Sequence, residues 1–254
     1  MLKKIAFISI ILLLTGCESS PEYNARMARL DNPEVHSEAF KFRTSIGSDG
    51  THEISLDRSR KLGSGRAARI DTAMTLGKGF EAKYVYNGFE KLSLKYQFYG
   101  AGRESASAGN WSHAVSLGYG EGEDDGYLYE DNYSWYQKVK FLDLALISGY
   151  RFNDSIQVYG GFFYQPGELD LEFYQYNRSK TEACESYYNY EEPPRECFIT
   201  QHDLNGENYG FNLAVELKVF SNLYLTLEAV HGLASWYGID NAETTANFNF
   251  AFYY

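Results

Sequence analysis

Long hydrophobic runs are absent from this sequence beyond its first fourteen residues, and cysteine is scarce. A helical membrane span needs about 20 consecutive apolar residues, so none is expected after that point. The chain is also short of positive charge, with 23 Lys and Arg against 34 Asp and Glu and a net charge of −11. This deficit argues against nucleic acid or a bare anionic lipid surface as the partner.

Aromatic residues, by contrast, are abundant and stand in alternating segments. The chain has 23 Tyr and 17 Phe, and its mean hydropathy is −0.42. A period of two along a strand places successive side chains on opposite faces. A membrane protein with negative mean hydropathy must hide its apolar band in such alternation, as the strands of a transmembrane barrel do.

The last nine residues show this alternation clearly. Phe248, Phe250, Phe252 and Tyr254 share one face of a predicted strand, and Asn249, Ala251 and Tyr253 stand between them. The ending resembles the C-terminal assembly signal of bacterial outer-membrane barrels. The resemblance implies recognition by the barrel-assembly machinery and places the chain terminus at the periplasmic rim.

The N-terminal residues have the pattern of a secretory signal. Lys3 and Lys4 precede an apolar stretch of about ten residues. Leu14-Thr15-Gly16-Cys17 resembles the lipobox of bacterial lipoproteins, which implies a lipid on Cys17 and handling by the lipoprotein-sorting machinery. We therefore expect a cleaved signal peptide over residues 1–16, a lipidated tether over 17–37 and one barrel domain over 38–254. An ordinary secretory signal is the alternative.

The two remaining cysteines, Cys184 and Cys197, predict a disulfide because the exterior of the cell is oxidising. Closing a loop of this length would stabilise the fold by roughly 3 kcal/mol. A metal site is the weaker alternative, since no histidine adjoins the two thiols. Neither a metal nor a cofactor is expected.

Nine alternating segments follow residue 66, and a bacterial single-chain barrel takes an even number of strands. The segment at 39–47 supplies the tenth. We therefore predict an all-β, transmembrane, up-and-down antiparallel barrel of about ten strands, with eight or twelve as alternatives. Tyr254 at the periplasmic rim makes Asn153-Asp154 and Ser221-Asn222 periplasmic turns. The predicted outward loops are Glu121–Asn132, Tyr174–Gly206 and Leu233–Ala242.

The run from Gly149 to Tyr164 resembles a hairpin common in the small-barrel superfamily of OmpA-like, OmpX-like and opacity proteins. Together with the terminal strand, this resemblance implies a small outer-membrane barrel. A soluble, lipocalin-like lipoprotein, whose apolar faces would point inward, is an alternative of a different class. The predicted barrel would be surrounded by outer-membrane lipids.

Charged residues on the opposite face of the predicted strands should point into the lumen. In so narrow a barrel they must form ion pairs or stay hydrated. A structural ion-pair network is the favoured interpretation, and a narrow pore lined by these groups is the alternative. The residues are Arg69, Asp71, Glu81, Lys83, Lys95, Asp143, Arg151, Glu216, Lys218 and Glu228.

Catalytic signals are weak, and an enzyme is not the favoured interpretation. His231, near the outer end of its strand with Ser235 close by, is the only weak candidate for a general base in an outer-leaflet lipid hydrolase. A protease resembling the ten-stranded omptins would need carboxylates and a histidine at the outer rim. His202, Asp203 and Asp240 are weaker candidates for that role.

The predicted outer loops are acidic and rich in tyrosine. Tyrosines among acids can serve protein recognition, although charge runs often only solvate loops, and divalent-cation binding is a further possibility. We therefore expect a role in envelope structure or surface interaction, such as adhesion to a host surface or recognition of an extracellular ligand.

Overall fold

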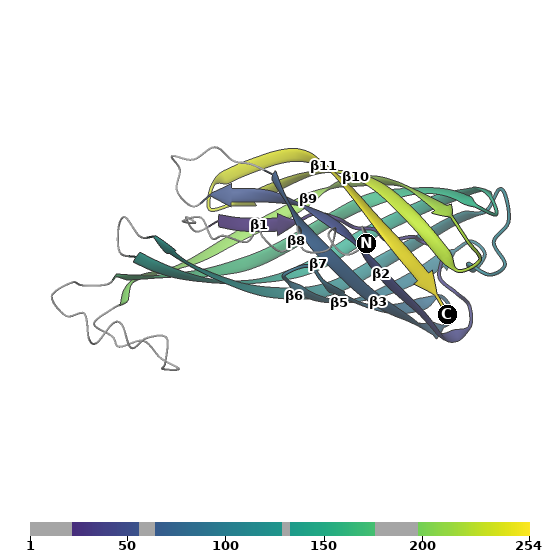
Figure 1. Cartoon of the computed structure of the whole chain (residues 1–254), viewed down its shortest axis with the longest axis horizontal. Helices are drawn as coiled ribbons and strands as arrows, with labels where there is room; N and C mark the ends of the chain where they lie inside the picture. The colour runs from purple at the N-terminus through teal and green to yellow at the C-terminus, as the bar shows by residue number, and fades with distance from the viewer. Residues whose placement is uncertain (1–21, 56–63, 129–132, 176–197) are drawn as a thin grey trace, which may run out of the picture.

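The computed structural model describes residues 22–55, 64–128, 133–175 and 198–254, and every statement below concerns these residues (Figure 1). They form eleven β-strands. The bounds are β1 Glu22–Arg26, β2 Ala39–Ser55, β3 Ser64–Gly77, β4 Phe80–Tyr86, β5 Glu90–Tyr99, β6 Trp111–Leu128, β7 Tyr133–Asn153, β8 Ile156–Gln175, β9 Phe198–Lys218, β10 Leu223–Trp236 and β11 Ile239–Tyr253.

Strands β2 to β11 close into a barrel of ten antiparallel strands. Each strand pairs with its neighbour in sequence, and β2 pairs with both β3 and β11, which closes the sheet. This confirms the predicted up-and-down barrel and its ten strands. The segment near 39–47 is indeed the strand that completes the even number, and it continues to Ser55.

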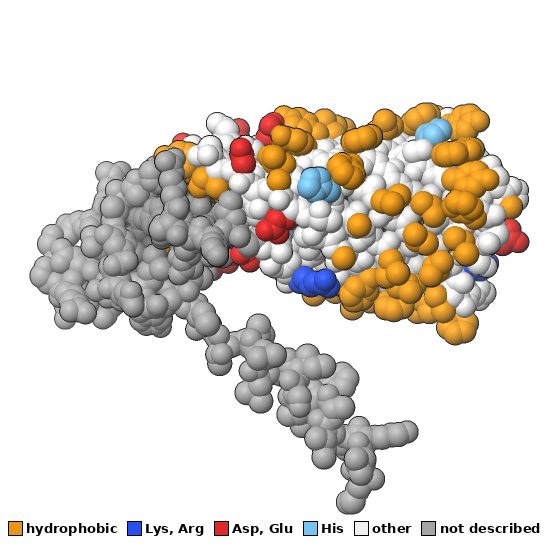
Figure 2. Space-filling model, turned by 90° about the horizontal axis from the view of Figure 1, so that it is seen from above, with side chains coloured by type: hydrophobic (Ala, Val, Ile, Leu, Met, Phe, Trp, Pro, Cys, Tyr) orange, Lys and Arg blue, Asp and Glu red, His pale blue; other side chains and the backbone are white. Residues whose placement is uncertain are grey.

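The alternation in the sequence becomes an inside and an outside. Along β5, Leu92, Leu94 and Phe98 are exposed, while Lys91 and Lys95 are buried. Figure 2 shows hydrophobic side chains spread over the barrel wall. An apolar exterior around a polar interior is the arrangement of outer-membrane barrels. The lipocalin-like alternative is therefore wrong, because the apolar faces point outward.

The two ends of the barrel differ in their connections. Tyr254 lies beside the short turns at one end, since the Tyr253 N–H donates to the Asn222 carbonyl and the Lys218 N–H to that of Ser155. Short turns belong on the periplasmic side, so we name this the periplasmic end and the other the outer end. The stretch between β5 and β6 also lies at the periplasmic end, and the short turn after Tyr86 lies at the outer end.

The strands reach further outward than the alternation predicts. β6 continues to Leu128 in pairing with β7, and β8 pairs with β9 up to Tyr174 and Phe198. Most of the described part of the three predicted outer loops is therefore strand. The prediction failed because the outward face becomes polar beyond the membrane belt, while residues such as Val139 and Leu171 still point into the core, so the ladder continues where the lipid-facing alternation stops. Residues 129–132 and 176–197, with both cysteines of the predicted disulfide, lie outside the described residues.

The segment expected to be a tether lies inside the barrel from its first described residues. β1 pairs antiparallel with the outer half of β2, with Glu22 opposite Ser55 and Arg26 opposite Thr51. After β1, every residue from Met27 to Val35 is buried. We name residues 23–35 the plug segment. It lacks periodicity because a chain surrounded by a barrel wall has no solvent face, and the same lack of periodicity led to the incorrect prediction of a solvated tether.

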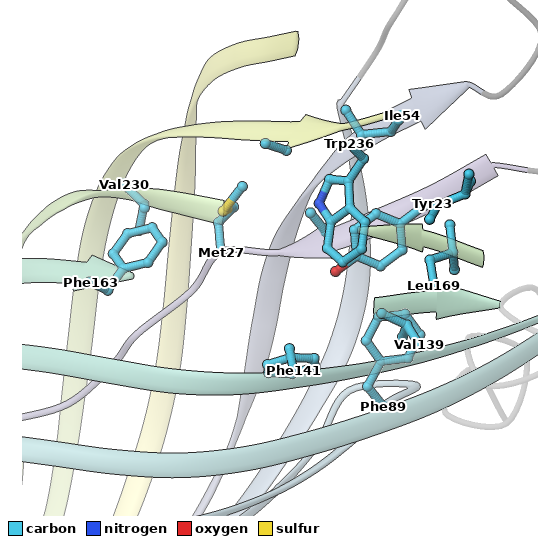
Figure 3. Close-up of a cluster of buried hydrophobic side chains, with 13 residues drawn as sticks. Tyr23, Met27, Ile54, Phe89, Val139, Phe141, Phe163, Leu169, Val230 and Trp236 are labelled. Atoms are coloured by element: carbon cyan, nitrogen blue, oxygen red, sulfur yellow. The ribbon is translucent and has the colours of Figure 1, made fainter. Parts of the chain in front are cut away.

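The outer half of the interior is an apolar core built around β1. Tyr23 packs against Trp236 with ring centroids 4.5 Å apart, and it lies parallel to Phe89 at 6.2 Å. Figure 3 shows these side chains converging from the plug segment and the surrounding strands. The core residues are Tyr23, Ala25, Met27, Ile54, Phe89, Val139, Phe141, Phe163, Leu169, Leu204, Val230, Ala234 and Trp236.

Candidate functional site: the filled lumen

The barrel wall first grips the plug segment through its backbone, just below the apolar core. The Met27 N–H donates to the Gly50 carbonyl at 3.3 Å, and the Ala28 N–H donates to Asp49 Oδ1 at 2.9 Å. Arg69 Nη1 donates to the Ala28 carbonyl at 2.8 Å. Buried backbone polar groups need such partners, because leaving one unpaired costs about as much as a lost hydrogen bond.

The carboxylate of Glu228 holds the next two residues. Its oxygens accept the backbone N–H groups of Arg29 and Leu30 at 3.0 and 2.9 Å, and also Asn212 Nδ2 at 2.7 Å. Leu30 has a left-handed φ of 47°. A left-handed residue can turn consecutive N–H groups toward one anion. The backbone of the plug segment thus binds the Glu228 carboxylate as a backbone anion site does.

Three ion pairs join the plug segment to the wall. Arg29 Nη1 lies 2.8 Å from Asp143 Oδ1, Asp31 pairs with Lys83, and Glu34 pairs with Arg151. Asp143 also pairs with Lys91 Nζ at 2.6 Å. All these side chains are almost fully buried, so each plug charge meets a charge of opposite sign without solvent screening.

Amide groups fill the space between the ion pairs. Asn32 Nδ2 donates to Gln157 Oε1 at 2.6 Å and to Glu216 Oε1 at 3.0 Å. Lys95 Nζ donates to the Asn32 carbonyl at 2.8 Å. Below them, the Val35 N–H donates to Gln97 Oε1 at 2.7 Å. Strands on opposite sides of the barrel therefore hold the same short segment.

Arg103, from the connection between β5 and β6, covers the periplasmic mouth. Its Nη2 lies 2.5 Å from Glu216 Oε1, and its guanidinium carbon lies 4.4 Å and 4.1 Å from the ring centroids of Tyr224 and Tyr253. Its backbone N–H donates to the Val35 carbonyl at 3.1 Å. The arginine therefore joins the end of the plug segment to the last two strands of the barrel.

The chain leaves the lumen beside Glu104 in the same connection. The Ser37 N–H donates to both Glu104 oxygens at 3.2 Å, and His36 Nδ1 lies 3.1 Å from Oε2. Partial burial alone would raise the pKa of Glu104, but the hydrogen bonds from Ser37 outweigh it and hold the pKa below its ordinary value. The carboxylate therefore stays charged where the chain turns into β2.

Charges of the two signs are balanced in the described interior. Eight cationic and eight anionic side chains are buried. Three of them belong to the plug segment, and Arg103 belongs to a periplasmic connection. The set is Arg29, Arg43, Arg69, Lys83, Lys91, Lys95, Arg103 and Arg151 with Asp31, Glu34, Asp49, Asp71, Glu81, Asp143, Glu216 and Glu228.

The structure buries nine of the ten charged residues that the sequence analysis placed in the lumen. Lys218 differs, since it is exposed at the periplasmic end of β9. The buried Arg43, Asp49 and Lys91 were not predicted as lumen residues, although Arg43 lies on the polar face of the predicted segment at 39–47 and Lys91 directly precedes another predicted strand. The charges of the plug segment were not predicted either, and their mixed signs were the available signal.

The other predicted site residues lie on the outer surface. Phe248, Phe250, Phe252 and Tyr254 are exposed on the wall, where a lipid-facing assembly signal would lie. His231 is also exposed, with Nδ1 2.9 Å from Thr244 Oγ1 and its ring 5.4 Å from that of Phe211. A threonine hydroxyl and a phenyl ring cannot orient and charge a general base as a carboxylate does.

The omptin-like candidates are spread over the outer end. In the strand register, Asp203 of β9 lies opposite Asp170 of β8, whereas Asp240 of β11 lies opposite Ser235 of β10. Within the described ranges, no group of three or more His, Cys, Asp or Glu side chains has a geometry that could hold a metal ion. None of the described residues belongs to a helix long and apolar enough to cross a membrane.

Comparison with known proteins gives structural matches only. No family model matches, and no curated protein matches. Solved structures that align include Ail, the attachment invasion locus protein of Yersinia pestis, at 9% identity over 85% of this chain and 99% of that one, with a TM-score of 0.36.

Two further structures align over comparable lengths of this chain. The outer membrane protease OmpT of Escherichia coli aligns at 10% identity over 94% of this chain and 97% of its own, with a TM-score of 0.37. The copper transporter OprC aligns at 11% identity over 87% of this chain and 43% of its own, with a TM-score of 0.33. Scores this low carry no argument about function. By its own strand ladder and apolar wall, the chain is a small ten-stranded barrel of the outer-membrane type, filled by its own N-terminal segment.

Proposed function

We propose that this protein is a sealed outer-membrane barrel that acts as a rigid platform for surface interaction, and not as a diffusion pore. The observation that carries the proposal is the plug segment, whose residues from Met27 to Val35 are all buried inside the barrel. An open pore would leave its lining side chains in contact with water. The pore hypothesis from the sequence therefore loses its support.

The platform is adapted to the outer envelope. The apolar wall fits a lipid bilayer, and the terminal phenylalanines fit recognition by the barrel-assembly machinery. We propose that a lipid on Cys17 adds a second attachment through the lipoprotein-sorting route, and that a disulfide between Cys184 and Cys197 stabilises the outer end.

An acidic outer surface is the part available for a partner. The sixteen buried charges of the described residues balance, so the net charge of −11 is carried by the other residues of the chain. On the outward extension of β6, Glu121, Glu123, Asp124 and Asp125 are exposed, and of these only Glu123 has a lysine partner, Lys138, among the described salt bridges. Figure 2 shows acidic side chains gathered beside the apolar belt. Charge complementarity favours a cationic protein or peptide as the partner.

Planar-bilayer recording tests the sealed state. The purified barrel should give no stable conductance steps, because a chain held by ion pairs and backbone hydrogen bonds fills the lumen. Discrete steady steps in the wild-type protein would contradict the proposal.

Ionic strength and charge neutralisation test the interaction. Binding of wild-type cells or purified barrel to a polylysine surface should fall as salt rises, and more steeply for the wild type than for Asp124→Asn/Asp125→Asn. Asp154→Asn, in the periplasmic turn after β7, is the matched control and should bind like the wild type. Equal binding by all three proteins would remove the acidic surface from the proposal.

A further inference from the structure

The plug segment has a direction. β2 begins at the periplasmic end and runs outward to Ser55, and β1 is antiparallel to it. The chain therefore enters the lumen at Glu22 from the outer mouth and descends toward the periplasm. Figure 1 shows β1 in the part of the barrel opposite to the C-terminus, with its arrow pointing into the barrel.

We infer that the chain preceding Glu22 emerges at the extracellular mouth, so that a lipid on Cys17 inserts into the membrane from the outside. The threading rests only on the described residues and the orientation of the barrel. The last step, the position of the lipid, rests on the proposed lipid anchor.

Contacts along the plug segment agree with this direction at three depths. Tyr23 packs on Trp236 at the outer end of β10, and Arg29 pairs with Asp143 in the middle of β7. Val35 accepts a hydrogen bond from Arg103 at the periplasmic mouth. Sequence order and depth therefore increase together, and the chain does not double back within the lumen.

The length of chain between Cys17 and Glu22 limits how far Cys17 can lie from the outer mouth. From Arg43, which pairs with Tyr253, to Ser55 the strand rises about 40 Å, or about 30 Å along the barrel axis at a tilt near 40°. The apolar band of such a barrel is about 25 Å tall. Five peptide steps from Glu22 back to Cys17 span at most about 18 Å. Cys17 therefore cannot reach the periplasmic end of the barrel.

Surface display of an epitope tests the threading in living cells. An epitope inserted between Pro21 and Glu22 of the full-length protein should bind antibody on intact cells. The same epitope at Gly238, in the outer turn between β10 and β11, is the positive control. The epitope in the periplasmic turn at Ser221-Asn222 should be detected only after permeabilisation. Detection of the first epitope only after permeabilisation would overturn the inference.

A cross-link tests the same point in a chain without an insertion, should the tagged protein fail to assemble. In a Cys184→Ser/Cys197→Ser background, Ala25→Cys/His52→Cys joins two residues that pair across β1 and β2. The control, Ala25→Cys/Ser112→Cys, places the second thiol at the buried Ser112, near the periplasmic end. We expect oxidation to shift the gel mobility of the first variant and not of the second. Absence of the first cross-link, or formation of the second, contradicts the inference.

Metabolic labelling with a fatty-acid analogue separates the two steps. The wild type should be labelled and Cys17→Ser should not. A surface epitope without acyl labelling would remove the lipid anchor and leave the threading intact. Acyl labelling with an epitope hidden in intact cells would leave the anchor and overturn the threading.

Discussion

The guanidinium of Arg29 and the carboxylate of Asp143 meet inside the barrel, with Nη1 and Oδ1 2.8 Å apart and the two side chains 3% and 1% exposed. Asp143 is shared, because Lys91 Nζ lies 2.6 Å from its other oxygen. One carboxylate of the wall thus neutralises a charge of the plug segment and a charge of the wall together. Asp143 therefore couples the plug directly to the wall.

Removing that carboxylate should therefore destabilise the barrel strongly. Asp143→Ala leaves two cations buried without their partner, and breaking a buried pair in this way costs roughly 3 to 5 kcal/mol. The unfolding midpoint in urea, followed by heat-modifiable gel mobility, measures the loss. Arg29→Met/Asp143→Leu, which removes both charges of the pair, should cost less than Asp143→Ala. A loss of stability in the double variant equal to the summed losses of Arg29→Met and Asp143→Leu would show that the pair is not coupled.

The sequence allowed the wall to be predicted because a membrane and a polar lumen impose opposite demands on neighbouring residues. Phe80, Ala82 and Tyr84 alternate with Glu81 and Lys83, and the structure exposes Phe80 and Tyr84 while it buries both charges. Nine strands and the outward face of the terminal phenylalanines follow from this requirement, and the even number of strands in such barrels predicts the tenth.

The plug segment could not be predicted in the same way. Arg29, Asp31 and Glu34 form no periodic face, because their partners are on different strands far away in the chain. Pairing over such distances leaves no local pattern. The outer strand extensions were not predicted for a related reason, since beyond the lipid the outward face is polar and the backbone hydrogen bonds of the ladder do not depend on a lipid-facing alternation.

Glu228 should hold the plug backbone through both carboxylate oxygens. Glu228→Gln replaces one accepting oxygen by an NH₂ group that faces the N–H of either Arg29 or Leu30, because each donates to a different oxygen. Leaving one of these buried donors unpaired costs about 1 to 3 kcal/mol. Hydrogen exchange should then become faster at the amides of Arg29 and Leu30. Glu207→Gln is the control, because Glu207 accepts a hydrogen bond from Tyr164 on the outer wall. If the two plug amides exchange as in the wild type, Glu228 does not hold them.

Arg103 should control access to the lumen from the periplasm. Arg103→Ala removes the guanidinium between Tyr224 and Tyr253 and leaves Glu216 without this ion pair. We expect exchange of the Val35 amide to rise, and conductance to stay absent because the apolar core closes the outer half. Arg66→Ala, at an exposed position near the start of β3, is the matched control. Stable conductance steps in Arg103→Ala would show that the arginine alone seals the barrel.

Gly206 should be essential for the packing of Trp236 in the apolar core. A Cβ at Gly206 would lie 2.2 Å from the Trp236 ring, a distance that forces the indole to move. Trp236 Nε1 donates to Asn208 Oδ1 at 2.8 Å, so its displacement also breaks a buried hydrogen bond. We expect Gly206→Ala to destabilise the barrel by roughly 1 to 3 kcal/mol and to shift the tryptophan emission to longer wavelength. Gly238→Ala, in the outer turn where a Cβ meets no atom within 4 Å, is the control for packing, although its φ of 71° adds some backbone strain. Because that strain has no counterpart at Gly206, the shift in tryptophan emission decides the outcome. A Gly206→Ala emission spectrum identical to that of the wild type would show that the indole does not lie against this glycine.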